Sequence, residues 1–161
     1  MKLYLLSHER ELTKSTNTGK LAQRCLGRRV EVIVWRRTEP NEDLVNELKL
    51  GKAALLFPRL EGESVQDVSD QEFESYIILD ATWQQARKMY RQSPYLKLAP
   101  KVSLNNVNAS TYRLRRNQIE DGLSTVECVI ELLKIKGENA KVIELSEAFH
   151  TMNNAQALKQ S

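Results

Sequence analysis

An aspartate, a threonine and a tryptophan stand together where an apolar segment gives way to an amphipathic one. Residues 76–79 are typical of a buried strand and residues 83–91 of the helix that follows, so Asp80-Ala81-Thr82-Trp83 lies at their junction. In open α/β sheets, ligands bind beyond the carboxyl ends of the strands, where the next helix also directs unpaired N–H groups. The pattern makes Asp80 a candidate site residue.

A structural interpretation of the same residues competes with the functional one. Thr82 and Gln85 have the types and spacing of a capping box, in which each side chain satisfies the backbone N–H of the other residue. Asp80 would then only fix the turn, since polar residues are common where a strand leads into a helix. The junction alone does not decide between the two interpretations.

Basic residues are concentrated in one stretch that begins directly after Asp80. Residues 81–119 contain no Asp or Glu and eight of the 24 Lys and Arg residues, whereas the rest of the chain carries 16 basic against 21 acidic residues. The formal net charge of +3 is therefore unevenly distributed. Such separation is typical of a face that binds a polyanion, although a solvated basic surface gives the same pattern.

The length and composition indicate one soluble domain. A chain of 161 residues can bury a substantial core, and we expect a single domain over residues 1–161. No apolar run approaches the roughly 20 residues that span a bilayer, and residues 1–6 are too short for a signal peptide, so a cytoplasmic protein is expected. Cys25 and Cys128 stand far apart, with no second Cys or His at metal-binding spacing. We expect buried free thiols, and neither a disulfide nor a metal.

The elements that must position Asp80 alternate between strand and helix patterns. Strands are expected at residues 3–6, 30–35, 53–57, 76–79, 102–104 and 142–145, because these runs are apolar. Helices are expected at residues 18–26, 41–50, 83–91, 124–136 and 146–158, because polar starts or glycine stops bound these runs. Residues 69–72 have the pattern of a capping box on a further short helix. The alternation indicates an α/β fold with a mostly parallel sheet and helices on both faces.

Residues 105–122 follow neither period and are rich in Asn, Arg, Ser and Thr. A loop of this length in a compact domain usually binds a ligand or is disordered, and a tyrosine among arginines favours binding. RNA recognition commonly uses unpaired bases stacked on aromatic or guanidinium planes. The residues expected to contact RNA are Tyr112, Arg113, Arg115 and Arg116 of this loop and Arg87 and Arg91 of the preceding helix.

Five segments together carry a family resemblance. Asp80–Trp83 matches the Asp-x-Thr-Trp signature for which the DTW-domain family is named, and the chain resembles that family. Four further segments match family motifs in the same order: residues 17–22 (Asn-Thr-Gly-Lys-Leu-Ala), 55–58 (Leu-Leu-Phe-Pro), 110–115 (Ser-Thr-Tyr-Arg-Leu-Arg) and 123–127 (Leu-Ser-Thr-Val-Glu). The resemblance therefore covers nearly the whole chain.

This resemblance implies a tRNA-uridine aminocarboxypropyltransferase, which moves the 3-amino-3-carboxypropyl group of S-adenosylmethionine to N3 of a uridine and releases methylthioadenosine. It also implies tRNA as the partner and a fold related to the SPOUT-type α/β enzymes, with a C-terminal trefoil knot. The oligomeric state, monomer or homodimer, stays open.

Two departures from the family pattern concern the N-terminal part of the chain. The cysteine cluster that many relatives carry there is missing, which again predicts no metal. The early His-Pro-x-Glu pattern reads His8-Glu9-Arg10-Glu11, so His8 stays open between a wall of the site and a surface residue.

The implied chemistry assigns a role to Asp80. The sulfonium of S-adenosylmethionine makes its attached carbons electrophilic, so the enzyme needs no covalent nucleophile and positioning should dominate. Uridine N3 must lose a proton, and Asp80 is the candidate to accept or orient it. A carboxylate is a weak base for an imide proton, so we expect Asp80 to hydrogen-bond N3–H, with proton removal late in the transition state.

An apolar slot with backbone hydrogen bonds is expected to hold S-adenosylmethionine. The residues expected to line it are Leu56, Phe57, Pro58, Leu79, Thr82, Trp83, Ser124 and Thr125. All except Pro58 also fit a core or capping role, and Trp83 fits either the core or a stack on a flipped-out base.

Three other functions stay open at the level of the sequence. A SPOUT-like RNA methyltransferase would use the same cofactor and release S-adenosylhomocysteine. A non-catalytic RNA-binding module would keep the basic loop and bind no S-adenosylmethionine. A small-molecule α/β enzyme would have little use for the acid-free basic stretch.

Overall fold

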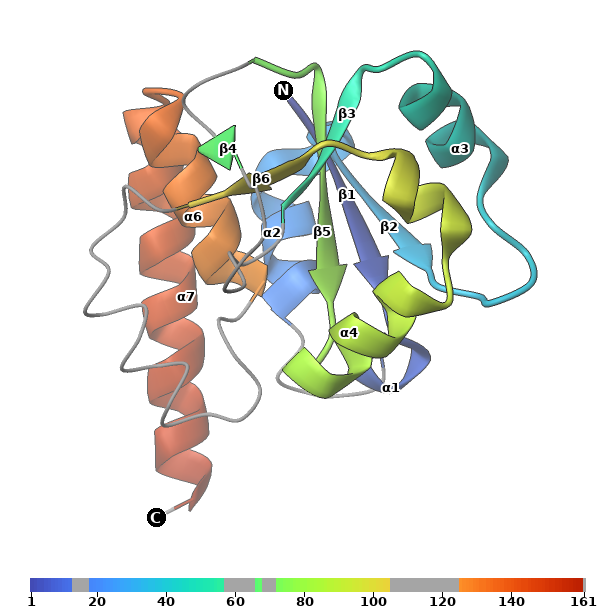
Figure 1. Ribbon diagram of the computed structural model, residues 1–161. Helices are drawn as coiled ribbons and strands as arrows, with labels where there is room; N and C mark the ends of the chain where they lie inside the picture. Colours follow the sequence, from blue (N-terminus) through green and yellow to red (C-terminus); the bar gives the residue numbers. More distant parts are fainter. Residues whose placement is uncertain (13–17, 57–65, 68–71, 105–124, 161) are drawn as a thin grey trace.

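The computed structural model describes residues 1–12, 18–56, 66–67, 72–104 and 125–160. Six strands of the described part form one sheet in the order β2-β1-β5-β3-β6-β4, and every strand pair is parallel (Figure 1). The strands are β1 Lys2–Ser7, β2 Val30–Val34, β3 Ala53–Leu56, β4 Gln66–Asp67, β5 Ser75–Asp80 and β6 Lys101–Ser103. The predicted α/β class and parallel sheet are confirmed.

The described helices connect these strands. The α-helices are α1 Glu9–Leu12, α2 Thr18–Leu26, α3 Glu42–Lys49, α4 Trp83–Arg91, α6 Thr125–Ile135 and α7 Asn139–Gln160. Two 3-10 helices follow α2 and α4, namely η1 Gly27–Arg29 and η2 Pro94–Leu98. Helix α1 and strand β4 were not expected from the sequence, because both are too short to show a period.

Alternate side chains of the strands feed two separate apolar layers. In β1, Leu3 and Leu5 lie in the layer shared with α2, α6 and α7, whereas Tyr4 and Leu6 lie in the layer shared with α3, α4 and η2. This alternation follows from the two-residue period of a strand. Helices therefore cover both faces of the sheet, as predicted (Figure 1).

Residues 142–145 form part of a helix, and the prediction of a strand there is wrong. They belong to α7, which runs without interruption from Asn139 to Gln160. Val142 and Leu145 begin an apolar row that Phe149 and Met152 continue, and this row packs against the layer beneath α2 and α6. Spacings of three and four residues are helical, so the apolar run of four residues was read with the wrong period.

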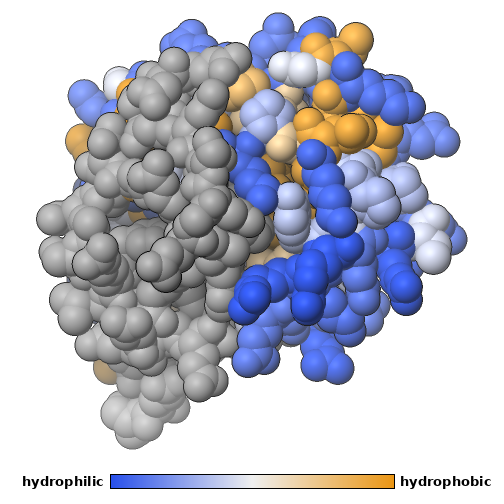
Figure 2. All heavy atoms as spheres, in the orientation of Figure 1, coloured by the Kyte–Doolittle hydropathy of each residue, from blue (hydrophilic) through white to orange (hydrophobic). Residues whose placement is uncertain are grey.

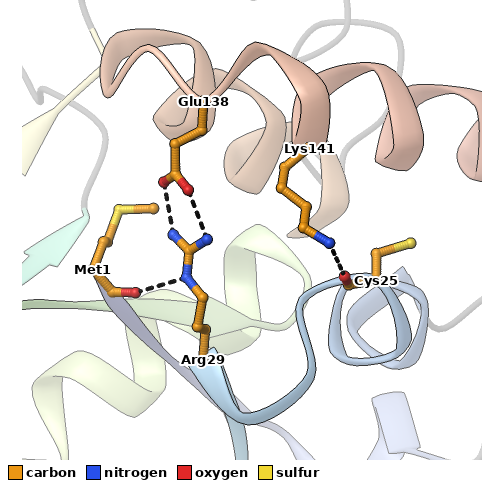
Figure 3. A network of polar contacts seen from close by, with 5 residues as sticks. All are labelled: Met1, Cys25, Arg29, Glu138 and Lys141. Carbon is orange, nitrogen blue, oxygen red and sulfur yellow. Dashed lines mark hydrogen bonds and ion pairs between the residues drawn. The ribbon is translucent and has the colours of Figure 1, made fainter.

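A network of polar contacts fixes the start of α7 to the amino-terminal edge of the sheet (Figure 3). The Arg29 guanidinium donates from Nη1 and Nη2 to the two carboxylate oxygens of Glu138, each at 2.6 Å, and from Nε to the Met1 carbonyl at 3.2 Å. Lys141 Nζ donates to the Cys25 carbonyl at 3.1 Å. The network ties β1, α2, η1 and α7 together on the side of the sheet away from the strands' carboxyl ends.

Several expectations fall on residues that lie outside the described part. They are the functional loop at 105–122 and residues 69–71 of the predicted capping box. The predicted trefoil knot is likewise not traced by the described residues. None of the described helices combines the length and the apolar character needed to cross a bilayer.

Candidate active site

The connections out of two neighbouring strands diverge at the centre of the sheet. From β1 the chain leads through α2, on one face, to β2 at one side, whereas from β5 it leads through α4, on the other face, to β6 at the opposite side. Strands β1 and β5 are adjacent, with Ser7 in register with Asp80. Divergent connections leave a crevice at the carboxyl ends of the two strands, where open α/β sheets bind their ligands. Asp80 is the last residue of β5 and lies at this switch point.

The Asp80 carboxylate is held by hydroxyl groups from two other elements. Ser7 Oγ of β1 donates to Oδ2 at 2.9 Å, and Thr125 Oγ1, at the first residue of α6, donates to Oδ1 at 2.5 Å. Asp80 is 6% exposed, Ser7 is 0% exposed and Thr125 is 5% exposed. Each carboxylate oxygen thus accepts at least one hydroxyl hydrogen bond within the described residues, and a carboxylate oxygen can accept more than one.

Backbone contacts continue this arrangement across three strands. The His8 N–H donates to the Asp80 carbonyl at 3.0 Å, and the Trp35 N–H donates to the Ser7 carbonyl at 2.8 Å. The residue that follows β1 is therefore fixed beside the end of β5, and the residue that follows β2 is fixed beside the end of β1.

The Cys128 thiol, on the same helix as Thr125, has a raised pKa. Cys128 lies one helical turn after Thr125 on α6, and burial, supplemented by the carboxylates of Glu131 and Asp80, raises the pKa of its thiol to about 12. A thiol with this pKa stays protonated near neutral pH and is a poor nucleophile. Both cysteines are free, as expected, but both are half-buried, so the prediction that they are buried is wrong.

Thr82 caps α4, and the structural interpretation of that residue is confirmed. Its Oγ1 accepts from the Gln85 N–H at 3.2 Å, while Gln85 Oε1 accepts from the Thr82 N–H at 2.9 Å. The Asp80 side chain takes no part in this cap, because its carboxylate accepts hydrogen bonds from Ser7 of β1 and Thr125 of α6. The competing interpretations therefore apply to different residues of the signature.

The predicted cofactor-binding residues are only partly brought together. Leu56, at the end of β3, lies on the same face of the sheet as Asp80 and Thr125, whereas Leu79 packs into the opposite layer. Trp83 begins α4, but its side chain lies outside the described part of the structure. So do Phe57, Pro58 and Ser124.

The predicted RNA-binding residues on α4 are exposed. Arg87, Lys88 and Arg91 are exposed on this helix, and the surface over α4 is strongly hydrophilic in Figure 2. The loop residues Tyr112, Arg113, Arg115 and Arg116 lie outside the described part.

Sequence reasoning missed several residues at this edge of the sheet. Ser7 was not proposed, although it is a polar residue at the end of an apolar strand, which is the signal that identified Asp80. Trp35, Arg36 and Arg37 follow the next strand, β2, and line a hollow together with His8 and Glu9. His8 thus lines this hollow. Within the described residues, no three His, Cys, Asp or Glu side chains come together as a metal site requires.

Comparisons with known proteins identify the family. The model of the DTW domain matches residues 1–157. The chain is similar to proteins named tRNA-uridine aminocarboxypropyltransferase 2, with 26% identity over 148 residues in Macaca fascicularis (88% of this chain, 50% of that protein). The corresponding values are 28% over 143 residues in Mus musculus (85% and 48%) and 29% over 139 residues in Drosophila melanogaster (83% and 55%).

The chain spans about half the length of these curated relatives. No solved structure matches it significantly. Because the family model covers almost the whole sequence, the chain belongs to the DTW domain family.

Proposed function

We propose that this protein transfers the 3-amino-3-carboxypropyl group of S-adenosylmethionine to N3 of a uridine in tRNA and releases methylthioadenosine. The observation that carries the proposal is the Asp80 carboxylate, buried at the switch point and held by Ser7 and Thr125. The names of the relatives support transfer of an aminocarboxypropyl group to a tRNA uridine, and the exposed cations of α4 suit a nucleic-acid substrate. The proposal includes a single domain over residues 1–161 and the SPOUT-like relationship of the fold with its C-terminal knot.

The residues around the crevice fit S-adenosylmethionine in their chemistry. The side of the sheet that holds Asp80 and Thr125 also presents Leu56, so polar acceptors and an apolar wall stand at one edge. When bound, the group supplies an electrophilic carbon beside a sulfonium, and no protein nucleophile is required. The protonated Cys128 thiol agrees with this, since the thiol closest to Asp80 along α6 is not activated.

Asp80 would act on the acceptor. Its carboxylate accepts a hydrogen bond from uridine N3–H and orients the nitrogen lone pair toward the electrophilic carbon. The N3–C bond forms as the C–S bond breaks, and the N3 proton leaves through the carboxylate late in the step. Ser7 and Thr125 keep the carboxylate from rotating, so they are positioning residues.

Mass spectrometry of the RNA and of the spent cofactor tests this function. The purified chain is incubated with unmodified tRNA and S-adenosylmethionine. The tRNA is then digested to nucleosides, and the masses of the nucleosides and of the small-molecule products are measured. We expect aminocarboxypropyl-uridine and an equal amount of methylthioadenosine. Methylated nucleosides with S-adenosylhomocysteine would instead indicate the methyltransferase, and tRNA binding with no product of either kind would indicate a binding module.

A further inference from the structure

A hollow of about 260 Å³ lies beside the candidate active site, at the carboxyl ends of β1 and β2. His8, Glu9, Trp35, Arg36 and Arg37 line it. Pockets that enclose a drug-sized ligand have volumes of roughly 300–1,000 Å³, so this hollow is small for a whole S-adenosylmethionine molecule. It has the size for a single planar group.

Two aromatic rings in the hollow are fixed in place. The rings of His8 and Trp35 are nearly parallel, with an interplanar angle of 20° and centroids 6.2 Å apart. The Trp35 indole donates from Nε1 to Oγ of the buried Ser93 at 2.7 Å, and both residues are bound to the sheet edge through their backbone N–H groups. Rings held in this way lose little conformational freedom when a flat ligand stacks on them.

The charges around the rings suit a ligand with flanking anions. Arg36 and Arg37 are exposed, and within the described residues neither forms an ion pair. Glu9 is the acidic group among the lining residues, and its carboxylate can accept hydrogen bonds from the N–H edge of a base or from a ribose hydroxyl. Aromatic faces combined with guanidinium groups are the usual means of binding an unpaired nucleotide.

We propose that this hollow is an RNA subsite in which one unpaired base stacks on Trp35 and His8 while Arg36 and Arg37 bind the adjoining phosphates. Trp35 belongs to the layer on the α4 face, whereas the Asp80 carboxylate is held by Thr125 from the α6 face. The base in the hollow is therefore a neighbour of the reacting uridine and not that uridine itself. This assignment rests on the proposed function in one respect, because the RNA that binds is taken to be the substrate.

Matched pairs of substitutions test the subsite in the full chain. The first comparison is between two double variants. One carries Arg36→Ala and Arg37→Ala, and its control carries Arg24→Ala and Arg28→Ala. Arg24 and Arg28 are also exposed, but they precede β2 and lie at the opposite edge of the sheet. The second pair is Trp35→Leu and Trp35→Phe, which differ in aromatic stacking although both lack the hydrogen bond to Ser93.

Affinity for unmodified tRNA is measured by fluorescence anisotropy over a range of salt concentrations, and affinity for S-adenosylmethionine by calorimetry. We expect the Arg36/Arg37 variant to bind tRNA about tenfold more weakly and to flatten the slope of log affinity against log salt by about 1.4, while the control stays within about twofold of the parent. Trp35→Leu should lose about tenfold in tRNA affinity, and Trp35→Phe should keep most of it. Affinity for S-adenosylmethionine should be unchanged throughout.

The subsite would be overturned if the Arg36/Arg37 variant bound tRNA as tightly as the parent, or if the Arg24/Arg28 control lost tRNA affinity to the same extent. It would also be overturned if the variants lost affinity for S-adenosylmethionine and kept their affinity for tRNA. The arginine variants change only exposed side chains, so the test does not depend on whether Trp35→Leu folds. Failure of the proposed function is distinguishable. Absence of aminocarboxypropyl-uridine, together with tRNA binding that depends on Arg36, Arg37 and Trp35, would leave the subsite standing and remove the reaction.

Discussion

At the scale of single residues, the Asp80 carboxylate is both a structural link and the proposed reacting group. Its bonds to Ser7 and Thr125 connect β5 to β1 and α6, so its removal leaves two buried hydroxyls without their acceptor. A buried polar group that loses its partner costs about 1–3 kcal/mol. Any test of Asp80 in turnover must therefore separate stability from activity.

Replacement of Asp80 by Asn makes that separation possible, because size and polarity are kept and the charge is lost. We expect Asp80→Asn to remain folded and to bind S-adenosylmethionine, with turnover lower by about 10²-fold or more, as is typical when a group that handles a proton is removed. Asp43→Asn, at an exposed position of α3, is the matched control and should have full turnover. Near-normal turnover in folded Asp80→Asn protein would rule out the proposed role, and circular dichroism with thermal unfolding verifies the folded state.

Thr125 tests the positioning of the same carboxylate. Thr125→Val keeps the shape of the side chain and removes the hydroxyl that donates to Asp80 Oδ1, whereas Thr125→Ser keeps the hydroxyl. We expect Thr125→Val to lower kcat more than it raises KM for tRNA and to lower the free energy of unfolding by about 1–3 kcal/mol. Thr125→Ser should keep most of the kcat of the parent protein. Unchanged kcat in Thr125→Val, or a loss in Thr125→Ser as large as that in Thr125→Val, would show that the hydroxyl does not position Asp80.

The raised pKa of Cys128 predicts a silent thiol. With a pKa of about 12, roughly one thiol in ten thousand is ionised at pH 8. In a Cys25→Ala variant, which leaves Cys128 as the one cysteine of the chain, a thiol-specific chromogenic disulfide should react only after denaturation. Stoichiometric reaction of the folded variant within seconds would contradict the raised pKa of this thiol.

The residues of this site differ in how far the sequence could reveal them. Asp80 and Thr82 were identifiable because a strand pattern and a capping pattern meet at adjacent positions. The Ser7–Asp80 bond joins residues 73 positions apart, and only the register of β1 against β5 creates it. The Trp35 hollow likewise depends on β2 being the neighbour of β1. Local patterns locate the ends of strands, but they do not show which ends meet.

At the scale of elements, helix α7 shows why short apolar runs mislead. Residues 142–145 have the composition of a buried strand, and the helical period emerges only when Phe149 and Met152 are included. The glycines that end helices were more informative. Gly51 and Gly137 were predicted as stops, and both adopt positive φ (71° and 74°), which residues with a Cβ adopt at a cost.

The Arg29–Glu138 pair at the start of α7 makes stability depend on pH (Figure 3). The hydrogen bonds from Arg29 hold the pKa of Glu138 below its ordinary value of 4.5. The unfolded chain then binds this proton more readily, so the stabilisation is fully present above the unfolded pKa and is lost as pH falls through the lower folded pKa. The pair should therefore contribute at neutral pH and fade in acid.

We expect Glu138→Gln to lower the free energy of unfolding by about 1 kcal/mol at pH 7, a figure at the upper end for a partly exposed ion pair because the geometry is bidentate. The difference from the parent should shrink toward zero as pH falls below the ordinary carboxyl range. Glu144→Gln, which breaks a more exposed pair with Lys141, is the matched control and should change the unfolding free energy less. Urea unfolding at several pH values measures both, and a Glu138→Gln deficit that grows in acid would contradict the assigned linkage.

At the scale of the whole molecule, the order of the strands in the sheet is the feature that could not be predicted from the sequence. Strand β5 is inserted between β1 and β3, although β3 precedes it in the chain. Hydrophobic period and caps specify each element and its buried face, but central parallel strands are all alike in being apolar on both faces. The α/β class was therefore predictable, but the position of the switch point was not. That position matters because Asp80 lies at the switch point, at the carboxyl end of β5.

Charge distribution, in contrast, could be read from the sequence, and it yields a prediction for the molecule as a whole. The acid-free stretch supplies α4, whose exposed cations lie on the same face of the sheet as the Trp35 hollow. RNA that occupies the hollow should therefore also cross α4. We expect Arg87→Ala combined with Arg91→Ala, which lie one helical turn apart, to reduce the slope of log tRNA affinity against log salt by about 1–2.

This loss should add to that of the Arg36/Arg37 variant, because contacts at separate phosphates without shared partners contribute nearly independently. Anisotropy titrations of the two double variants, the quadruple variant and the Arg24/Arg28 control across the same salt series measure the additivity. A quadruple variant no weaker than either double variant would mean that the RNA does not occupy both surfaces at once. A control that loses as much as the α4 variant would mean that the net charge of +3, and not its placement, governs binding.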